Sequence, residues 1–178
     1  GQVNVSCFGG SDGSASGTIS CGTANYTYLW SPGSATTNSI SNLTAGTYSL
    51  TATDSKGCTA VNSVVITQPT VLTASTSSTN ETCNYLNNGT ATAVPSGGTA
   101  GYTYLWRPGL QTTATISGLS SGTYSLTITD SKGCSATTIA VITQPTALVA
   151  GFAGQINVSC FGGNDGSVSG IISGGTPN

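Results

Sequence analysis

Residues 45–58 read AGTYSLTATDSKGC, and residues 121–134 read SGTYSLTITDSKGC. In the second copy the alternation directs Tyr124, Leu126 and Ile128 to one side of an extended segment and the intervening hydroxyl side chains to the other. The Asp-Ser-Lys-Gly sequence that follows is typical of a tight turn, in which Asp caps the local backbone and Gly takes the left-handed conformation. Both stretches therefore predict a β-hairpin whose first strand packs one face on a core.

These hairpins belong to a longer repeat. The chain of 178 residues contains NVSCFGGSDG from Asn4, NETCNYLNNG from Asn80 and NVSCFGGNDG from Asn157, at spacings of 76 and 77 residues. A period of this length has the size of a small domain and is longer than a solenoid unit. We predict three segments: a repeat at 1–69 with an incomplete first strand, a repeat at 70–145, and an incomplete third repeat at 146–178 that cannot close its own core.

The fold class follows from the strand and turn signals. Short segments rich in Thr and Val, such as 49–53 and 125–129, alternate with turns of Gly, Asn, Pro and Asp, and no segment has the pattern of a helix. We predict an all-β chain of tandem immunoglobulin-like antiparallel β-sandwich modules, with one disulfide in each module. For the second repeat the expected strands are 71–77, 89–95, 102–107, 112–116, 122–130 and 134–143.

Several aromatic positions recur in both repeats. Tyr48 and Tyr124 follow a Gly at a strand start, which resembles the tyrosine corner of immunoglobulin-like domains; a plain core tyrosine is the alternative. Trp30 and Trp106 lie between the cysteines of their repeats, and we expect them in the core, with a sugar-stacking platform as the alternative. The candidate surface-contact residues are Tyr26 and Tyr102.

The six cysteines predict disulfides rather than a metal site, because they form no CxxC motif and the chain has no histidine. Disulfides in turn indicate an oxidising, extracellular compartment. We expect bridges within repeats, Cys7 with Cys58 and Cys83 with Cys134, since the members of each pair are 51 residues apart. Each bridge would contribute about 4 kcal/mol in the chain-entropy model. A head-to-tail bridge from Cys7 to Cys134 of the next repeat is the alternative.

Two cysteines stand outside these pairs. Cys160 is the first cysteine of the incomplete third repeat. Cys21 has Gly97 and Gly174 as its counterparts, so it belongs to no repeated pair. We expect Cys21 to be a lone buried thiol, with an intermolecular bridge as the alternative.

Charge is scarce, because charged residues make up 4% of the chain, while Ser and Thr make up about a third. With only three basic residues, the chain is not suited to bind nucleic acid or an anionic membrane surface. No segment is long and apolar enough for membrane insertion.

Without histidine the common nucleophilic machinery cannot form, so we predict no enzyme and no cofactor. Asp12 is replaced by Asn88 in the second repeat, which argues against a calcium site, and we predict no metal.

Four runs together resemble the SprB repeat: NVSCFGGSDGSASGTIS from Asn4, YTYLWSPG from Tyr26, LTAGTYSLTATDSKGC from Leu43 and VITQP from Val65. This family is named for a very large surface adhesin of gliding Bacteroidota. The resemblance implies export by the type IX secretion route, display on the cell surface as a filament, and a role in adhesion or gliding motility. Two departures are Cys21, where Gly is usual, and NETCNYLNNG in place of the SCFGG form.

We therefore expect a structural tandem-repeat segment of an extracellular, cell-surface filament or adhesin. The expected partners are other copies of the repeat along the same chain, other filament chains and surface polysaccharide. Repetition would multiply weak single contacts into firm attachment. The alternative function is a glycan-binding module of a secreted surface protein, which would use the hydroxyl-rich strand faces and the aromatic residues.

Overall fold

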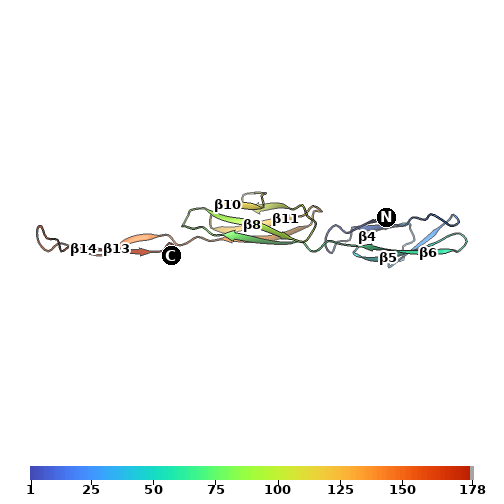
Figure 1. Cartoon of the computed structure of the whole chain (residues 1–178), viewed down its shortest axis with the longest axis horizontal. Helices are drawn as coiled ribbons and strands as arrows, with labels where there is room; N and C mark the ends of the chain where they lie inside the picture. Colours follow the sequence, from blue (N-terminus) through green and yellow to red (C-terminus); the bar gives the residue numbers. More distant parts are fainter. Residues whose placement is uncertain (177–178) are drawn as a thin grey trace. The chain divides into compact units, whose positions relative to one another are not determined.

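The computed structural model describes residues 1–176, and every regular element in that range is a β-strand (Figure 1). The predicted all-β class is therefore confirmed. In the second repeat the expected strands agree with β7 to β12 to within three residues at either end. The strands are β1 (Gln2–Val3), β2 (Gly13–Ser16), β3 (Thr27–Ser31), β4 (Ser39–Leu43), β5 (Gly46–Thr53), β6 (Thr59–Ile66), β7 (Thr73–Thr79), β8 (Gly89–Ser96), β9 (Thr103–Arg107), β10 (Thr115–Leu119), β11 (Gly122–Thr129), β12 (Ser135–Ile142), β13 (Val149–Ile156) and β14 (Ser167–Ser173).

The contacts divide the chain into two units that do not follow the sequence repeats. One unit comprises Gly1–Ala74, Pro95–Thr103 and Ile128–Ala136. The other comprises Ser75–Val94, Tyr104–Thr127 and Thr137–Asn178. The division into domains at 1–69, 70–145 and 146–178 therefore stays a prediction, and "repeat" denotes these sequence ranges below.

Each complete repeat contributes two three-stranded sheets. Their strand orders are β1-β2-β4 and β3-β5-β6 in the first repeat, and β10-β8-β7 and β12-β11-β9 in the second, while β13 pairs with β14 in the third. The central strand β5 runs antiparallel to both of its neighbours. Its register with β6 pairs Thr53 with Thr59 at one end and Gly46 with Ile66 at the other. This register fixes which loops lie at which end of β6.

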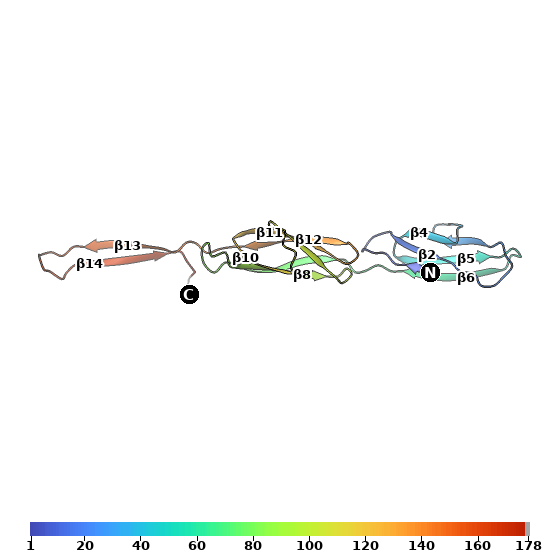
Figure 2. The ribbon, with the colours of Figure 1, turned by 90° about the horizontal axis from the view of Figure 1, so that it is seen from above.

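The core of the first repeat lies between its two sheets. Ala15 and Leu43 come from the β1-β2-β4 sheet, and they pack with Trp30 and Leu50 of the β3-β5-β6 sheet. Figure 2 shows the strands of the two sheets, with β2 and β4 labelled in one and β5 and β6 in the other. The Trp30 ring is buried, and its Nε1–H donates to the carbonyl oxygen of Thr37 at 2.9 Å. The predicted antiparallel sandwich is thus confirmed, and the tryptophan belongs to its core.

Strand β11 alternates between buried and exposed side chains as predicted. In β11 the side chains of Leu126 and Ile128 are buried, whereas Thr123 and Ser125 are exposed. Burying an aliphatic side chain of this size contributes about 1.5–3 kcal/mol relative to leaving it exposed. Burial of these side chains therefore supplies a substantial part of the free energy that stabilises the packing of β11 on the core.

The tyrosine corner is also confirmed in both repeats. The Tyr48 hydroxyl donates to the carbonyl oxygen of Thr44 at 3.1 Å, and the Tyr124 hydroxyl donates to that of Ser120 at 3.0 Å. Each tyrosine thereby ties the start of its strand to the preceding loop. The interpretation as plain core tyrosines does not account for these bonds.

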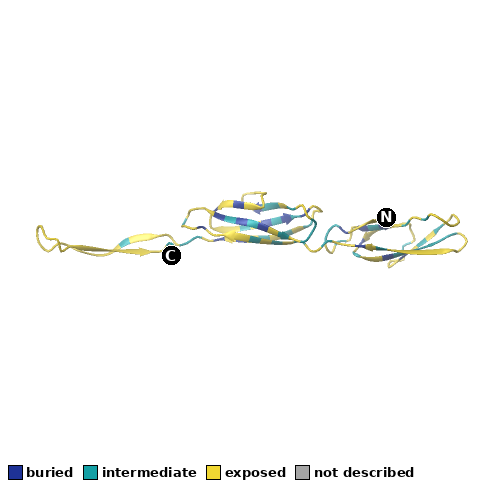
Figure 3. Ribbon diagram, viewed as in Figure 1, coloured by how far each residue is buried: buried dark blue, intermediate teal, exposed yellow. Residues whose placement is uncertain are grey.

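The third repeat contains a two-stranded sheet without a core. No residue of β13 or β14 is buried, and Figure 3 shows the hairpin almost entirely in the colour of exposed residues. Phe152 and Ile172 are 80% and 77% exposed. The hairpin presents apolar side chains that the described residues 146–176 do not cover.

Candidate functional site

The Asp-Ser-Lys-Gly-Cys turn is built around the side chain of its aspartate. In the second repeat Asp130 Oδ1 accepts hydrogen bonds from the backbone N–H groups of Lys132 and Cys134, both at 2.9 Å. Its Oδ2 accepts from the N–H of Thr99 at 2.8 Å. These donors, Thr99 foremost, hold the pKa of the Asp130 carboxyl below its ordinary value. The turn is therefore fastened to the Gly-Gly-Thr loop that precedes β9.

The first repeat contains the same arrangement. Asp54 Oδ1 accepts from the N–H groups of Lys56 and Cys58 at 2.9 Å, and Oδ2 accepts from the N–H of Thr23 at 3.0 Å. The N–H of Thr23 and those of the turn lower the pKa of the Asp54 carboxyl, as the equivalent donors do for Asp130. The two turns thus present Cys58 and Cys134 from equivalent frames.

A disulfide joins Cys7 to Cys134, with the two Cα atoms 5.7 Å apart. The bridge connects the loop after β1 in the first repeat to the β11–β12 turn of the second repeat. Cys134 Sγ also lies 3.4 Å from the carbonyl oxygen of Ser6. The head-to-tail pairing, which was the alternative in the sequence analysis, is the one that the structure contains.

The pairing of Cys7 with Cys58 and of Cys83 with Cys134 is wrong. In the first repeat the N–H of Val5 donates to Thr67 just beyond the end of β6, whereas Cys58 lies directly before its start at Thr59. Eight strand residues span roughly 27 Å. Disulfide Cα atoms lie within about 7 Å of each other. The two cysteines are therefore at opposite ends of the strand.

The second repeat shows the same separation. The N–H of Glu81 donates to the carbonyl oxygen of Thr143 at 3.0 Å, which places the following Cys83 at the far end of β12 from Cys134. Cys83 and Cys58 are thiols in the structure, and both are exposed. We expected one bridge within each repeat, and neither of these two bridges is present.

Cys21 and Cys160 are exposed thiols as well. The expectation that Cys21 is buried is therefore wrong. Cys21 lies in the loop before β3, at an exposed position on the surface. Its position in the sequence identified it as unpaired but carried no information about exposure.

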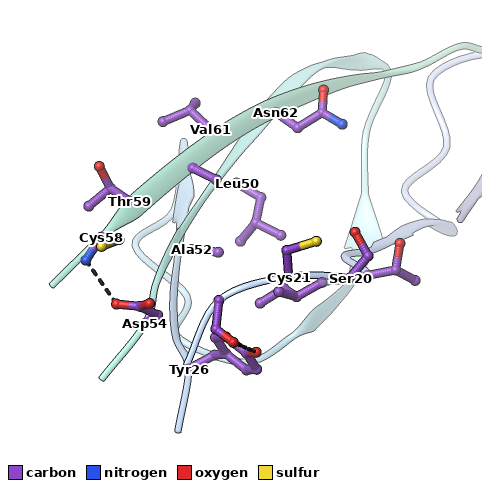
Figure 4. Close-up of a pocket in the computed structure, with 14 residues that line it drawn as sticks. Ser20, Cys21, Tyr26, Leu50, Ala52, Asp54, Cys58, Thr59, Val61 and Asn62 are labelled. Carbon is purple, nitrogen blue, oxygen red and sulfur yellow. Dashed lines mark hydrogen bonds between the residues drawn. The ribbon is translucent and has the colours of Figure 1, made fainter. Parts of the chain in front are cut away.

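Cys21 and Cys58 line one hollow of about 410 Å³, shown in Figure 4. Leu50 and Val61 line its apolar part, and Tyr26 lies at its edge beside Asp54. The Tyr26 hydroxyl donates to the carbonyl oxygen of Gly22 at 3.2 Å. The hollow therefore combines an aromatic ring, a carboxylate and two thiols, although the tyrosine hydroxyl is already engaged by its own loop.

The equivalent Tyr102 is held in the same way. Its hydroxyl donates to the carbonyl oxygen of Gly97 at 2.7 Å, and the residue is half-buried. Both candidate surface tyrosines thus brace the loop before β3 or β9, and their contact with a ligand stays a prediction. More exposed aromatic residues follow the first cysteine of each repeat: Phe8, Tyr85 and Phe161. These three residues were not predicted as contact residues, although their position close to the cysteines is a signal that the sequence contains.

The linker after the first repeat packs closely against a pair of glycines, Gly97 and Gly98. The N–H of Gly98 donates to the carbonyl oxygen of Thr70 at 3.0 Å. A Cβ on Gly97 would lie 2.0 Å from the carbonyl oxygen of Val71, and the φ of Gly97 is +74°. No residue with a side chain fits there without moving the linker.

Besides Asp130, the second repeat buries the acidic side chain of Glu81. Glu81 is 4% exposed, and its Oε2 accepts from the N–H of Asn87 at 2.8 Å. Its Oε1 accepts from the N–H of Ser121. The equivalent residues in the other repeats are Val5 and Val158, so this buried side chain belongs to the second repeat and organises two loops there.

Other kinds of site find no support within residues 1–176. No group of three or more Cys, Asp or Glu side chains gathers there as ligands of a metal ion would. In the same range no helix has the length and apolar character needed to cross a membrane.

The SprB repeat model matches the chain at residues 2–35 and 75–111. Two stretches of the chain are therefore similar to the SprB repeat. Each match contains the first cysteine of a repeat, Cys7 or Cys83, together with the YTYLW run that forms β3 or β9. The resemblance stated from the sequence is therefore confirmed for these two stretches.

Among solved structures, the chain is similar to the N-terminal four Ig domains of Dscam1 isoform 9.44, with 14% identity and a TM-score of 0.35 over 67% of this chain and 36% of that one. It is also similar to the N-terminal eight Ig domains of DSCAM isoform 1.30.30, with 14% identity and a TM-score of 0.35 over 84% of this chain and 23% of that one. The chain spans less than half the length of either structure, and a likeness this distant says nothing about binding. No curated protein matches the chain.

Proposed function

We propose that this chain is a structural segment of an extracellular, cell-surface adhesin in which SprB repeats are joined in series by disulfides. The observation that carries the proposal is the bridge from Cys7 of one repeat to Cys134 of the next. Such a bridge persists in an oxidising compartment, which supports an extracellular location. Export by the type IX route, a filament and a role in adhesion or gliding are the finer parts of the proposal, and the SprB matches support them.

The bridge suits a segment that bears tension. A pull along the chain passes from Cys7 to Cys134 through the sulfur atoms, so the residues between them carry no load. Repeats connected in this way keep their folds, and many identical surfaces can then act together on one target. The chain contributes reach and repetition, and no reaction is assigned to it.

Surface display and adhesion can be tested on cells that produce the protein. Antibody against the chain should label intact, unpermeabilised cells, and deletion of the protein should reduce the number of cells retained on a surface under flow. A deletion strain with the Cys7→Ser protein restored should be retained less well than one with the wild-type protein, because load then falls on the repeats. Unlabelled intact cells, or retention that does not change on deletion, would contradict the proposal.

A second candidate function is glycan binding, which the hollow beside Tyr26 favours. Saturable binding of a polysaccharide to the full chain, lost in Tyr26→Ala, would support it. Tyr85→Ala is the matched control, because Tyr85 is 77% exposed and lies outside the hollow. Absence of saturable binding across a polysaccharide array would leave the structural function as the better account.

A further inference from the structure

Cys83 stands in the same surroundings as the bridged Cys7. The residue before each cysteine donates its N–H to an Asx side chain, Ser6 to Asp12 at 2.9 Å and Thr82 to Asn88 at 3.0 Å. In both loops a backbone N–H also donates to a glutamine of the following linker: Gly9 donates to Gln68 at 2.7 Å, and Tyr85 donates to Gln144 at 2.9 Å. The loop that presents Cys7 to its partner is therefore preserved around Cys83.

The linker after the second repeat contacts a pair of glycines, as the linker after the first repeat does. We call each linker together with the loop that it contacts a joint; the first joint connects the first and second repeats, and the second joint connects the second and third. The N–H of Gly175 donates to the carbonyl oxygen of Thr146 at 3.0 Å, as Gly98 does to Thr70. A Cβ on Gly174 would lie 2.0 Å from the carbonyl oxygen of Ala147, the same clearance as at Gly97. The second joint thus reproduces the first in its backbone contacts.

The first joint shows which contacts position Cys134 beside Cys7. There the N–H of Thr99, directly after the two glycines, holds Asp130 Oδ2, and Asp130 Oδ1 holds the N–H of Cys134. Thr176 is the counterpart of Thr99 and lies against the Cys83 loop, since its hydroxyl donates to the carbonyl oxygen of Thr82 at 3.2 Å. An Asp-Ser-Lys-Gly-Cys turn seated on Thr176 would therefore reach Cys83 as Cys134 reaches Cys7.

The space for that turn is present. A hollow of about 280 Å³ lies beside Cys83 and is lined by both sides of the joint. Its lining includes Thr82, Cys83, Thr146, Leu148, Gly174 and Thr176. The residue equivalent to Cys134 in the third repeat would follow Cys160 by 51 positions, beyond Asn178.

We propose that Cys83 forms a second disulfide between repeats. Its partner is the cysteine of an Asp-Ser-Lys-Gly-Cys turn in a further copy of this repeat. This inference concerns the pairing at one residue and rests on the proposed function only for the presence of such a copy. The bond forms by exchange with a small disulfide such as oxidised glutathione. One thiolate attacks it and releases one glutathione, the partner thiolate then displaces the second, and both glutathiones leave as thiols.

Cys58 does not have the surroundings that such a bridge needs. The loop beside it carries Cys21 where Gly97 and Gly174 receive the linker. A side chain at that position would collide with a linker seated in the same way. The exposed Cys58 thiol is therefore not assigned a partner repeat.

The test appends further repeat sequence to the full chain. A copy of residues 102–145 is joined after Asn178, which continues the register of the repeat. The protein is oxidised with glutathione, alkylated without reduction, digested and analysed by mass spectrometry. We expect Cys83 to be linked to the appended copy of Cys134, while Cys160 is alkylated. In the matched control, with serine at the appended cysteine, Cys83 should be alkylated as fully as in the original chain.

Retention of the Cys7–Cys134 peptide shows that the first joint is intact in every sample. Free Cys83 in the extended chain, or a bond between Cys83 and Cys160, would overturn the inference. A second measurement uses the original chain and a peptide of residues 129–136 activated as a pyridyl disulfide. Cys83 should form the mixed disulfide several-fold faster than Cys160, and equal rates would also count against the inference. Failure of cell-surface labelling would overturn the proposed function without altering either result.

Discussion

Reduction of the Cys7–Cys134 bond is expected to lengthen the stretch of chain that extends under force. The bridged residues are 127 positions apart, and the intact bond shields everything between them from a pull applied at the two termini. A fully extended residue spans at most about 3.3–3.6 Å. Breaking the bond should therefore release about 440 Å of contour length that the oxidised chain cannot reach at any force below rupture of the bond.

Optical tweezers can measure this length if the handles are attached through peptide tags at the termini, which leaves the thiols untouched. Force–extension curves are recorded with and without dithiothreitol. Cys7→Ser should reproduce the reduced curves in the absence of reductant, and Cys21→Ser should leave the oxidised curves unchanged. Bridges within repeats would each hide 51 residues and release about 180 Å apiece. Steps of that size, or equal contour lengths in both conditions, would refute the reasoning.

Three further predictions concern stability. Glu81→Ala should lower the free energy of unfolding by about 3 kcal/mol, because the N–H groups of Asn87 and Ser121 lose their acceptor. Glu81→Gln, whose side chain keeps one acceptor oxygen for these N–H groups, should cost clearly less, and equal losses in urea titrations would contradict this account. Gly97→Ala should lower the melting temperature more than Gly154→Ala, because a Cβ on Gly97 would lie 2.0 Å from a carbonyl oxygen whereas Gly154 has open space around it; the reverse order in a thermal scan would show that the linker moves freely. The pKa of the Asp130 carboxyl is lower in the folded state than its ordinary 3.8, so its contribution to stability is present above that value and is lost as the pH falls through the folded-state pKa. Urea midpoints measured from about pH 5 to about pH 2 should fall less steeply for Asp130→Asn than for the wild type, and parallel curves would exclude this role.

The strands and turns could be predicted because short-range interactions determine them. Alternation along residues 122–129 selects the buried face of β11, and Asp130 closes its turn through N–H groups two and four residues away. The tyrosine corner joins two residues only four positions apart, Ser120 and Tyr124. Each of these features depends on neighbours in the chain, so a repeated sequence repeats the structure as well.

The disulfide pairing could not be predicted from spacing. Two cysteine pairs have equal separations of 51 residues, which favoured bridges within repeats, but this count carries no information about the end of a strand at which each cysteine lies. The burial of Glu81 has a similar origin, since one of its donors is Ser121, 40 residues along the chain. The exposure of Cys21 likewise depends on which segments cover its loop.

The amino-acid sequence by itself therefore determined the period, the strands, the turns and the aromatic core positions, because alternation and turn chemistry act over a few residues. Only the tertiary structure decided which cysteine meets which. An eight-residue strand separates the ends of its hairpin by roughly 27 Å, so Cys7 cannot reach Cys58. The turn of the next repeat, held on Thr99 through Asp130, brings Cys134 within bonding distance instead.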